Sequence, residues 1–192
     1  MDKLGGIMLK VTAGFIGGVM FTAILVYLLM PGMMFRETVS PFGMEETIAR
    51  IQHNIADNPD LKQKGWSLSG LRNPARAIET AGGNVLPVQM IEACSTNYSK
   101  PILKDDSVRF LSILMPCKIS VYKKNDGKVY IGTMNAGMMG QMFGPMVGDV
   151  MAQVAEDQKQ FLIMDPSKPA PQIIQPQAPA TGGSGGGASG GC

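Results

Sequence analysis

The sequence contains a run without charged residues near its N-terminus, from Val11 to Phe35. A helix of about twenty residues spans about 30 Å, which is the thickness of the hydrocarbon part of a membrane. A cleavable secretion signal is the alternative, but its apolar part is shorter, and no small-residue cleavage motif follows this run. The run therefore predicts a retained transmembrane helix over residues 11–34, preceded by a short flank over residues 1–10.

The charges that flank the run predict its orientation. Lys3 and Lys10 precede it, and Arg36 follows it. Because positive charge favours the cytoplasmic side, we expect a single-pass inner-membrane protein with its N-terminus in the cytoplasm and its main domain in the periplasm or another extracytoplasmic space. Gly14 and Gly18 form a G-x-x-x-G pair, which lets two membrane helices approach closely. The helix is therefore also a candidate contact in a homodimer.

The C-terminal end of the chain differs in composition from the part before it. From Asp165 onward the residues are mostly Pro, Gly, Ala, Ser and Gln, which cannot bury enough apolar surface to fold. This composition predicts a disordered tail over residues 164–192. The tail ends in Cys192, which is either a tethering thiol or a remnant of an expression vector. The net charge of +2 comes without a basic stripe, so we expect no nucleic acid partner.

Between these ends, the periodicity of apolar residues predicts one α+β domain over residues 35–163. A helical stripe that would pack on a sheet is formed by Ile48, Ile51 and Ile55. Asp126-Gly127 separates two alternating segments and predicts a β-hairpin. Gly144-Pro145 interrupts the last helical stretch, so we expect a short helix before Pro145 and a longer one after it.

Two cysteines lie at the strands of this domain. Cys117 falls on the more apolar side of a strand predicted over residues 110–124, and Cys94 ends another predicted strand. If they meet on neighbouring strands, they could form a disulfide or redox pair, or bind a soft metal or another ligand. Burial as small apolar residues is the alternative. The chain has no C-x-x-C or zinc-ligand spacing, which disfavours a thioredoxin-like mechanism, and the sequence indicates no particular cofactor.

Six methionines lie between residues 134 and 151. Thioethers suit Cu(I), so Met138, Met142 and Met146 are candidate metal ligands. Their four-residue spacing is also that of a helix face packed against a sheet, and methionine fills irregular cores readily. Packing is therefore the favoured interpretation of these three residues.

Three segments, "MIEACSTNYSKPILKDD", "LMPCKISVYKKNDGKVYI" and "MMGQMFGPMVGDVMAQVAEDQ", resemble the family called domain of unknown function 302. The resemblance covers Phe35 to Leu162. Two cysteine steps of the family are matched by Glu92-Ala93-Cys94 and by Met115-Pro116-Cys117. The chain departs from the family in Ser95-Thr96, where Asn-Pro is usual, and in Met115, where Leu is usual. The resemblance implies an α+β fold like that of the TATA-binding protein, with a curved antiparallel sheet, helices on one face and often a dimer. It implies no activity.

These observations favour a membrane-anchored, non-enzymatic module that binds a small ligand, a soft metal or a partner protein. A thiol-redox protein that uses Cys94 and Cys117 is one alternative, and a structural domain that dimerises is another. The carboxylate pairs Glu45-Glu46 and Asp105-Asp106 fit a helix N-terminus and a loop. We therefore predict no catalytic residue.

Overall fold

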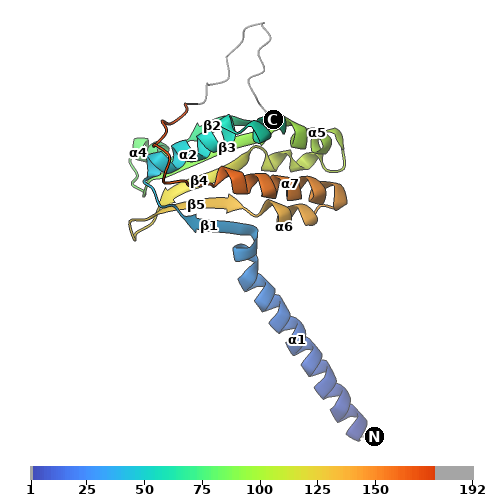
Figure 1. The fold of residues 1–192 in the computed structure, drawn as a ribbon. Coiled ribbons are helices and arrows are strands. Elements are labelled where there is room, and N and C mark those ends of the chain that lie inside the picture. The colour runs from blue at the N-terminus through green and yellow to red at the C-terminus, as the bar shows by residue number, and fades with distance from the viewer. Residues whose placement is uncertain (1, 176–192) are drawn as a thin grey trace.

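The computed structural model describes residues 2–175, apart from the side chains of residues 2–11, 13 and 31. It begins with one long helix, α1 (Asp2–Met34), which projects away from the rest of the molecule (Figure 1). The described part of the chain contains no helix that meets the length and apolarity expected of a membrane span. The transmembrane assignment of residues 11–34 therefore stays a prediction.

The folded domain is organised around one antiparallel sheet of five strands in the described part of the chain, in the order β1-β5-β4-β3-β2. The strands are β1 (Phe35–Val39), β2 (Trp66–Arg72), β3 (Val88–Ser95), β4 (Cys117–Lys123) and β5 (Val129–Met134). The predicted hairpin is confirmed, since β4 pairs directly with β5. Gly127 has φ of 78° in the turn, a value that side chains disfavour and glycine tolerates.

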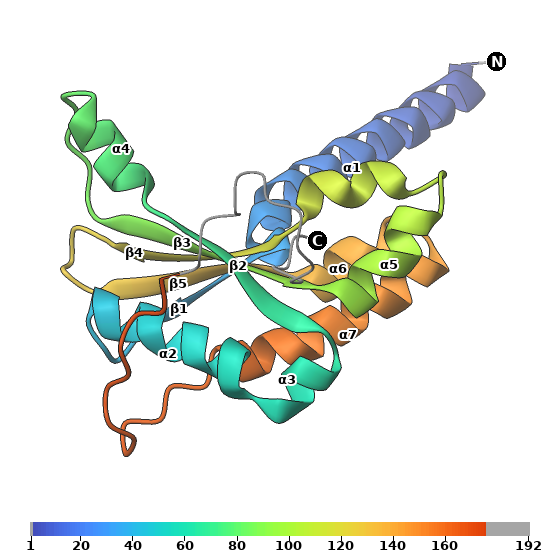
Figure 2. The ribbon, with the colours of Figure 1, turned by 90° about the horizontal axis from the view of Figure 1, so that it is seen from above.

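The helices fall between and after the strands. They are α2 (Met44–Asp57), α3 (Pro59–Gln63), α4 (Pro74–Thr80), α5 (Thr96–Lys104), the 3₁₀ helix η1 (Arg109–Leu114), α6 (Ala136–Gln141) and α7 (Pro145–Phe161). Figure 2 shows α2, α3 and α7 on the same side of the sheet, with α4 beyond the ends of the strands. The predicted α+β class with an antiparallel sheet is confirmed, and so is the break between the last two helices at Gly144-Pro145.

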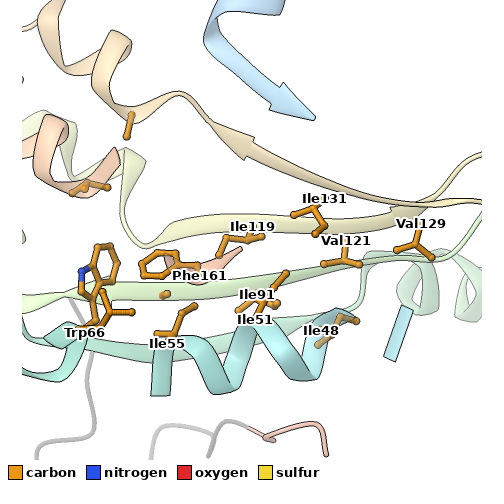
Figure 3. Close-up of a cluster of buried hydrophobic side chains, with 14 residues drawn as sticks. Ile48, Ile51, Ile55, Trp66, Ile91, Ile119, Val121, Val129, Ile131 and Phe161 are labelled. Atoms are coloured by element: carbon orange, nitrogen blue, oxygen red, sulfur yellow. The ribbon is translucent and has the colours of Figure 1, made fainter. Parts of the chain in front are cut away.

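The core lies between the sheet and α2, as Figure 3 shows. The three isoleucines that were expected to form a stripe, Ile48, Ile51 and Ile55, are all fully buried. They pack on side chains of the central strands and on Phe161 of α7, which is fully buried too. Side chains alternate along β4, where Ile119 and Val121 are buried, whereas Lys118 is exposed and Ser120 is half-buried. Hydrophobic burial therefore fixes which side of each strand faces the helices.

One predicted strand starts later than its sequence suggested. The alternation began at Phe110, but residues Arg109–Leu114 form η1, and β4 begins at Cys117. In η1 only Leu111 is buried, while Phe110 and Ile113 are exposed. The apolar positions before Pro116 therefore do not form one side of a strand. The strand predicted from their alternation is wrong over residues 110–116.

The boundary of the predicted tail at residue 164 is also corrected. Side chains of α2 hold the backbone of the segment 165–175, since Arg50 donates to the carbonyl oxygens of Asp165 and Lys168, each at 2.8 Å. The buried Gln52 side chain donates to the carbonyl of Ile174 at 2.7 Å and accepts from its N–H at 2.9 Å. Composition missed this segment because polar side chains of α2 bind its backbone, while Ile173 is one of its few apolar residues that pack against the core. The remainder of the predicted tail, with Cys192, lies outside the described residues.

Candidate functional site

An apolar pocket lies at the end of the sheet, where β3 and β4 meet α5, η1, α6 and α7. Its interior is about 50 Å³. Part of its lining comes from a second buried cluster, made of Ile102, Leu111, Val147 and Val150. No histidine, carboxylate or lysine is among the described residues that line it. The pocket can therefore exclude water and accept a small apolar or soft group, and its lining lacks the side chains that most often act as general acids or bases.

Sulfur is concentrated in the lining of this pocket. Six sulfur-containing side chains contribute to it: Cys94, Met115, Cys117, Met134, Met139 and Met151. They come from five strands or helices and from the step before β4, so they are far apart in the sequence. The fold thus brings these sulfur-containing side chains together in one pocket. Their spacing in the sequence does not predict this arrangement.

Cys117 is the first residue of β4 and carries a free thiol. It pairs across the sheet with Ala93, which belongs to the main core. Burial raises the pKa of the Cys117 thiol to about 11, against the weaker opposing effect of the Lys118 charge. At neutral pH the side chain is therefore a protonated thiol, which is a poor nucleophile.

Cys94 lies one position beyond Ala93 on β3 and pairs with Ser67. Its sulfur is 3.4 Å from the Ser99 hydroxyl oxygen. Cys94 is disulfide-bonded while Cys117 is free, so the two cysteines do not bond to each other. A bond between the two was one of the alternatives left open by the sequence, and it is absent here. Successive residues of a strand point to opposite sides of the sheet, and Cys117 is level with Ala93 rather than with Cys94. Both cysteines nevertheless reach the same pocket at the end of the sheet.

The carboxylate of Asp157, on α7, is fully buried and was not identified from the sequence. It accepts hydrogen bonds from Lys64 Nζ at 2.5 Å, Trp66 Nε1 at 2.8 Å and the Tyr98 hydroxyl at 3.0 Å. Burial, and then the adjacent Asp157 carboxylate, raise the pKa of Tyr98 to about 12. The sequence contained a signal that could have identified Asp157. It falls on the buried side of α7 with Val150, Val154 and Phe161, where a charged side chain needs partners.

Trp66 and Tyr98 connect this carboxylate to the pocket, since both rings also line it. Their ring centroids are 6.0 Å apart in an edge-to-face arrangement. The Trp66 ring makes a second edge-to-face contact with Phe161, at 4.8 Å. These contacts and the bonds to Asp157 fix the orientation of both rings.

The methionines that were the candidate metal ligands do not line the pocket. Met138 lies on α6, Met142 follows the end of that helix, and Met146 lies on α7, so the three do not share one helix face. Met142 and Met146 are 57% and 36% exposed. Residues 2–175 also contain no cluster of three or more His, Cys, Asp or Glu side chains that could hold a metal ion. The metal-binding role of these three methionines stays a prediction without support from their positions.

The comparisons with known proteins concern the same part of the chain. The family model described as "Domain of unknown function DUF302" matches residues 36–164. The chain belongs to this family. A crystal structure of an uncharacterised conserved DUF302 protein from Bacillus stearothermophilus is similar, with a TM-score of 0.57 and 22% sequence identity. The similarity covers 68% of this chain and 97% of that chain, and it shows the DUF302 fold alone. No curated protein matches the chain.

The resemblance noted in the sequence is thereby confirmed for the DUF302 domain. The matched region begins at Arg36, directly after the start of β1, and includes every residue that lines the pocket. Helix α1 precedes the matched region. The DUF302 family description names no activity, so the geometry of the pocket is the basis for any functional conclusion.

The surroundings of Cys117 predict its reactivity in the intact chain. We expect a maleimide to label Cys117 in the folded protein at least tenfold more slowly than in urea, because the buried thiol must first be exposed. Mass spectrometry of proteolytic peptides, after timed labelling, measures this ratio. Labelling of Cys117 at the same rate in the folded and the unfolded chain would show that the thiol is accessible and would contradict the geometry.

Proposed function

We propose that this DUF302 domain is a non-enzymatic module that binds one small ligand in the apolar pocket at the end of its sheet. The observation that carries this proposal is the pocket itself, an interior of about 50 Å³ with a lining of mainly apolar and sulfur-containing side chains. Water in a protein interior needs two to four polar partners, and the hydroxyls of Ser95 and Ser99 in this lining already donate to backbone carbonyls. An apolar or soft occupant suits it better.

The size of the pocket limits the ligand. An engineered cavity of about 150 Å³ in another protein admits benzene and xenon. That volume is about three times the interior of the pocket found here. The ligand is therefore an atom or a very small molecule rather than a drug-sized or lipid-sized compound. The described lining also lacks His, Asp, Glu and Lys side chains, which favours binding over acid–base catalysis.

The thiol-redox alternative has less support. It requires Cys94 and Cys117 to exchange a bond, but they start from opposite sides of the sheet and are not bonded to each other. It also requires a reactive thiolate, whereas the pKa of Cys117 is raised by burial. The dimerisation alternative, through Gly14 and Gly18 of α1, stays a hypothesis.

Trp66 offers a direct test of ligand entry, because it is the single tryptophan of the chain and lines the pocket. Xenon under pressure should quench its fluorescence in a saturable manner, since a heavy atom would occupy the space beside the ring. Val150→Ile should reduce this saturable quenching by at least half, because one added methylene fills part of the space.

The matched control is Val85→Ile, which adds the same methylene at an exposed position outside the pocket. It should quench like the unchanged chain. Quenching that rises linearly with xenon pressure in all three proteins would show that xenon quenches Trp66 only by collision from solvent. This result would contradict the proposal of a ligand pocket.

We also propose that α1 attaches the domain to a membrane, with the DUF302 domain on the extracytoplasmic side. The support is the uncharged run from Val11 to Phe35 together with its exposed apolar side chains. Phe21 and Leu28, for example, are 68% and 67% exposed and lie on a helix that projects from the domain (Figure 1). Exposed apolar surface of this extent requires a partner surface.

Alkaline carbonate extraction tests this attachment. Cell membranes that contain the full chain should retain it in the pellet, because an apolar helix is not released by loss of ionic contacts. A variant with Leu25→Lys and Leu28→Lys should move largely to the supernatant, since two charges in the run cost several kcal/mol in the bilayer core. Recovery of the unchanged chain in the supernatant would rule out the attachment.

A further inference from the structure

The donor atoms of the pocket determine which ligand suits it, an inference that rests on the proposed binding function of that pocket. Four thioethers and one free thiol line it, from Met115, Met134, Met139, Met151 and Cys117. Thioether and thiolate sulfur are soft donors, which favour soft monovalent ions and bind hard ions such as Mg²⁺ or Ca²⁺ poorly. The lining thus has the donor chemistry of a soft-metal site.

The arrangement brings these sulfurs together from separate parts of the fold. Met134 ends β5, Met139 lies on α6, and Met151 lies on α7. Gly140 allows α6 and α7 to approach, because a Cβ at that position would be 2.3 Å from the Cβ of Met151. The close contact of the two helices therefore depends on a residue without a side chain, and it brings Met151 beside Met139 and the rest of the lining.

Charge decides which soft ion suits an apolar interior. A singly charged ion bound to one thiolate forms a neutral unit, whereas a divalent ion with the same thiolate leaves a net positive charge. An uncompensated charge in an apolar interior is costly, and no carboxylate lines this pocket to balance it. The single free thiol therefore matches a monovalent ion.

We propose that the pocket binds one Cu(I) ion through the Cys117 thiolate and neighbouring methionine thioethers. On binding, the S–H bond of Cys117 breaks, a Cu–S bond forms, and the proton is released to solvent. Copper remains Cu(I) and no residue is oxidised or reduced. An interior of about 50 Å³ accommodates a single ion but not a larger cluster.

A competition titration tests the proposal with the full chain in a non-ionic detergent under anaerobic conditions. Cu(I) is supplied as its coloured bicinchoninate complex, and the loss of colour reports transfer of the ion to the protein. We expect one equivalent of Cu(I) per chain. Cys117→Ala should weaken binding at least tenfold, and Met139→Leu should weaken it severalfold, because each removes a sulfur from the pocket.

The matched control is Met142→Leu, which makes the same change at an exposed methionine outside the pocket and should leave the affinity unchanged. Circular dichroism and the emission of Trp66 check that each variant is folded. X-ray absorption at the copper edge should then show sulfur neighbours without nitrogen or oxygen. If Cys117→Ala fails to fold, the difference in Cu(I) affinity between Met139→Leu and Met142→Leu still tests whether the pocket binds the ion.

Three results would overturn the proposal: no transfer of Cu(I) to the unchanged chain, full binding by folded Cys117→Ala, or equal loss in Met142→Leu and Met139→Leu. The xenon measurement separates this failure from that of the proposed function. A pocket that admits xenon but takes no Cu(I) would leave the binding module intact and remove only the copper site. A pocket that admits neither would remove both.

Discussion

The buried carboxylate of Asp157 is the constraint on which the functional end of this domain depends. A carboxylate without exposure to water must receive hydrogen bonds or an opposite charge, because its desolvation is otherwise unfavourable by several kcal/mol. Asp157 meets this requirement with Lys64, Trp66 and Tyr98, which lie at the end of α3, on β2 and on α5. One side chain of α7 thus joins three other parts of the chain.

The pocket follows from this arrangement. Trp66 and Tyr98 are oriented by Asp157 on one side and line the pocket on the other. Apart from Ser95 and Ser99, the rest of the lining is apolar or sulfur-containing. The Ser95 hydroxyl donates to the Lys64 carbonyl and the Ser99 hydroxyl to the Ser95 carbonyl, so both hydroxyls have partners within the protein. The result is a small interior with fixed aromatic rings and soft donor atoms, which is the basis on which we propose binding rather than catalysis.

Local patterns in the sequence predicted the elements whose contacts are periodic. The stripe of Ile48, Ile51 and Ile55 and the turn at Asp126-Gly127 specify a helix face and a hairpin without reference to distant residues. Apart from η1, the features that sequence reasoning missed depend on contacts between distant segments. The segment 165–175 is held by Arg50 and Gln52, and the sulfur-lined pocket gathers residues from β4, β5, α6 and α7. The methionines at helical spacing, Met138, Met142 and Met146, do not line this pocket and do not share one helix face, because α6 ends before α7 begins.

Hydrogen exchange of the Trp66 indole N–H tests the central claim most directly, since the single tryptophan gives one indole signal by NMR. In the full chain we expect this proton to exchange at least about 100-fold more slowly than in free tryptophan, because its bond to Asp157 is buried. Asp157→Asn should accelerate the exchange about tenfold or more, while Glu156→Gln, at the exposed neighbouring position, should not change it. Exchange as fast as in free tryptophan, or no effect of Asp157→Asn, would contradict the account.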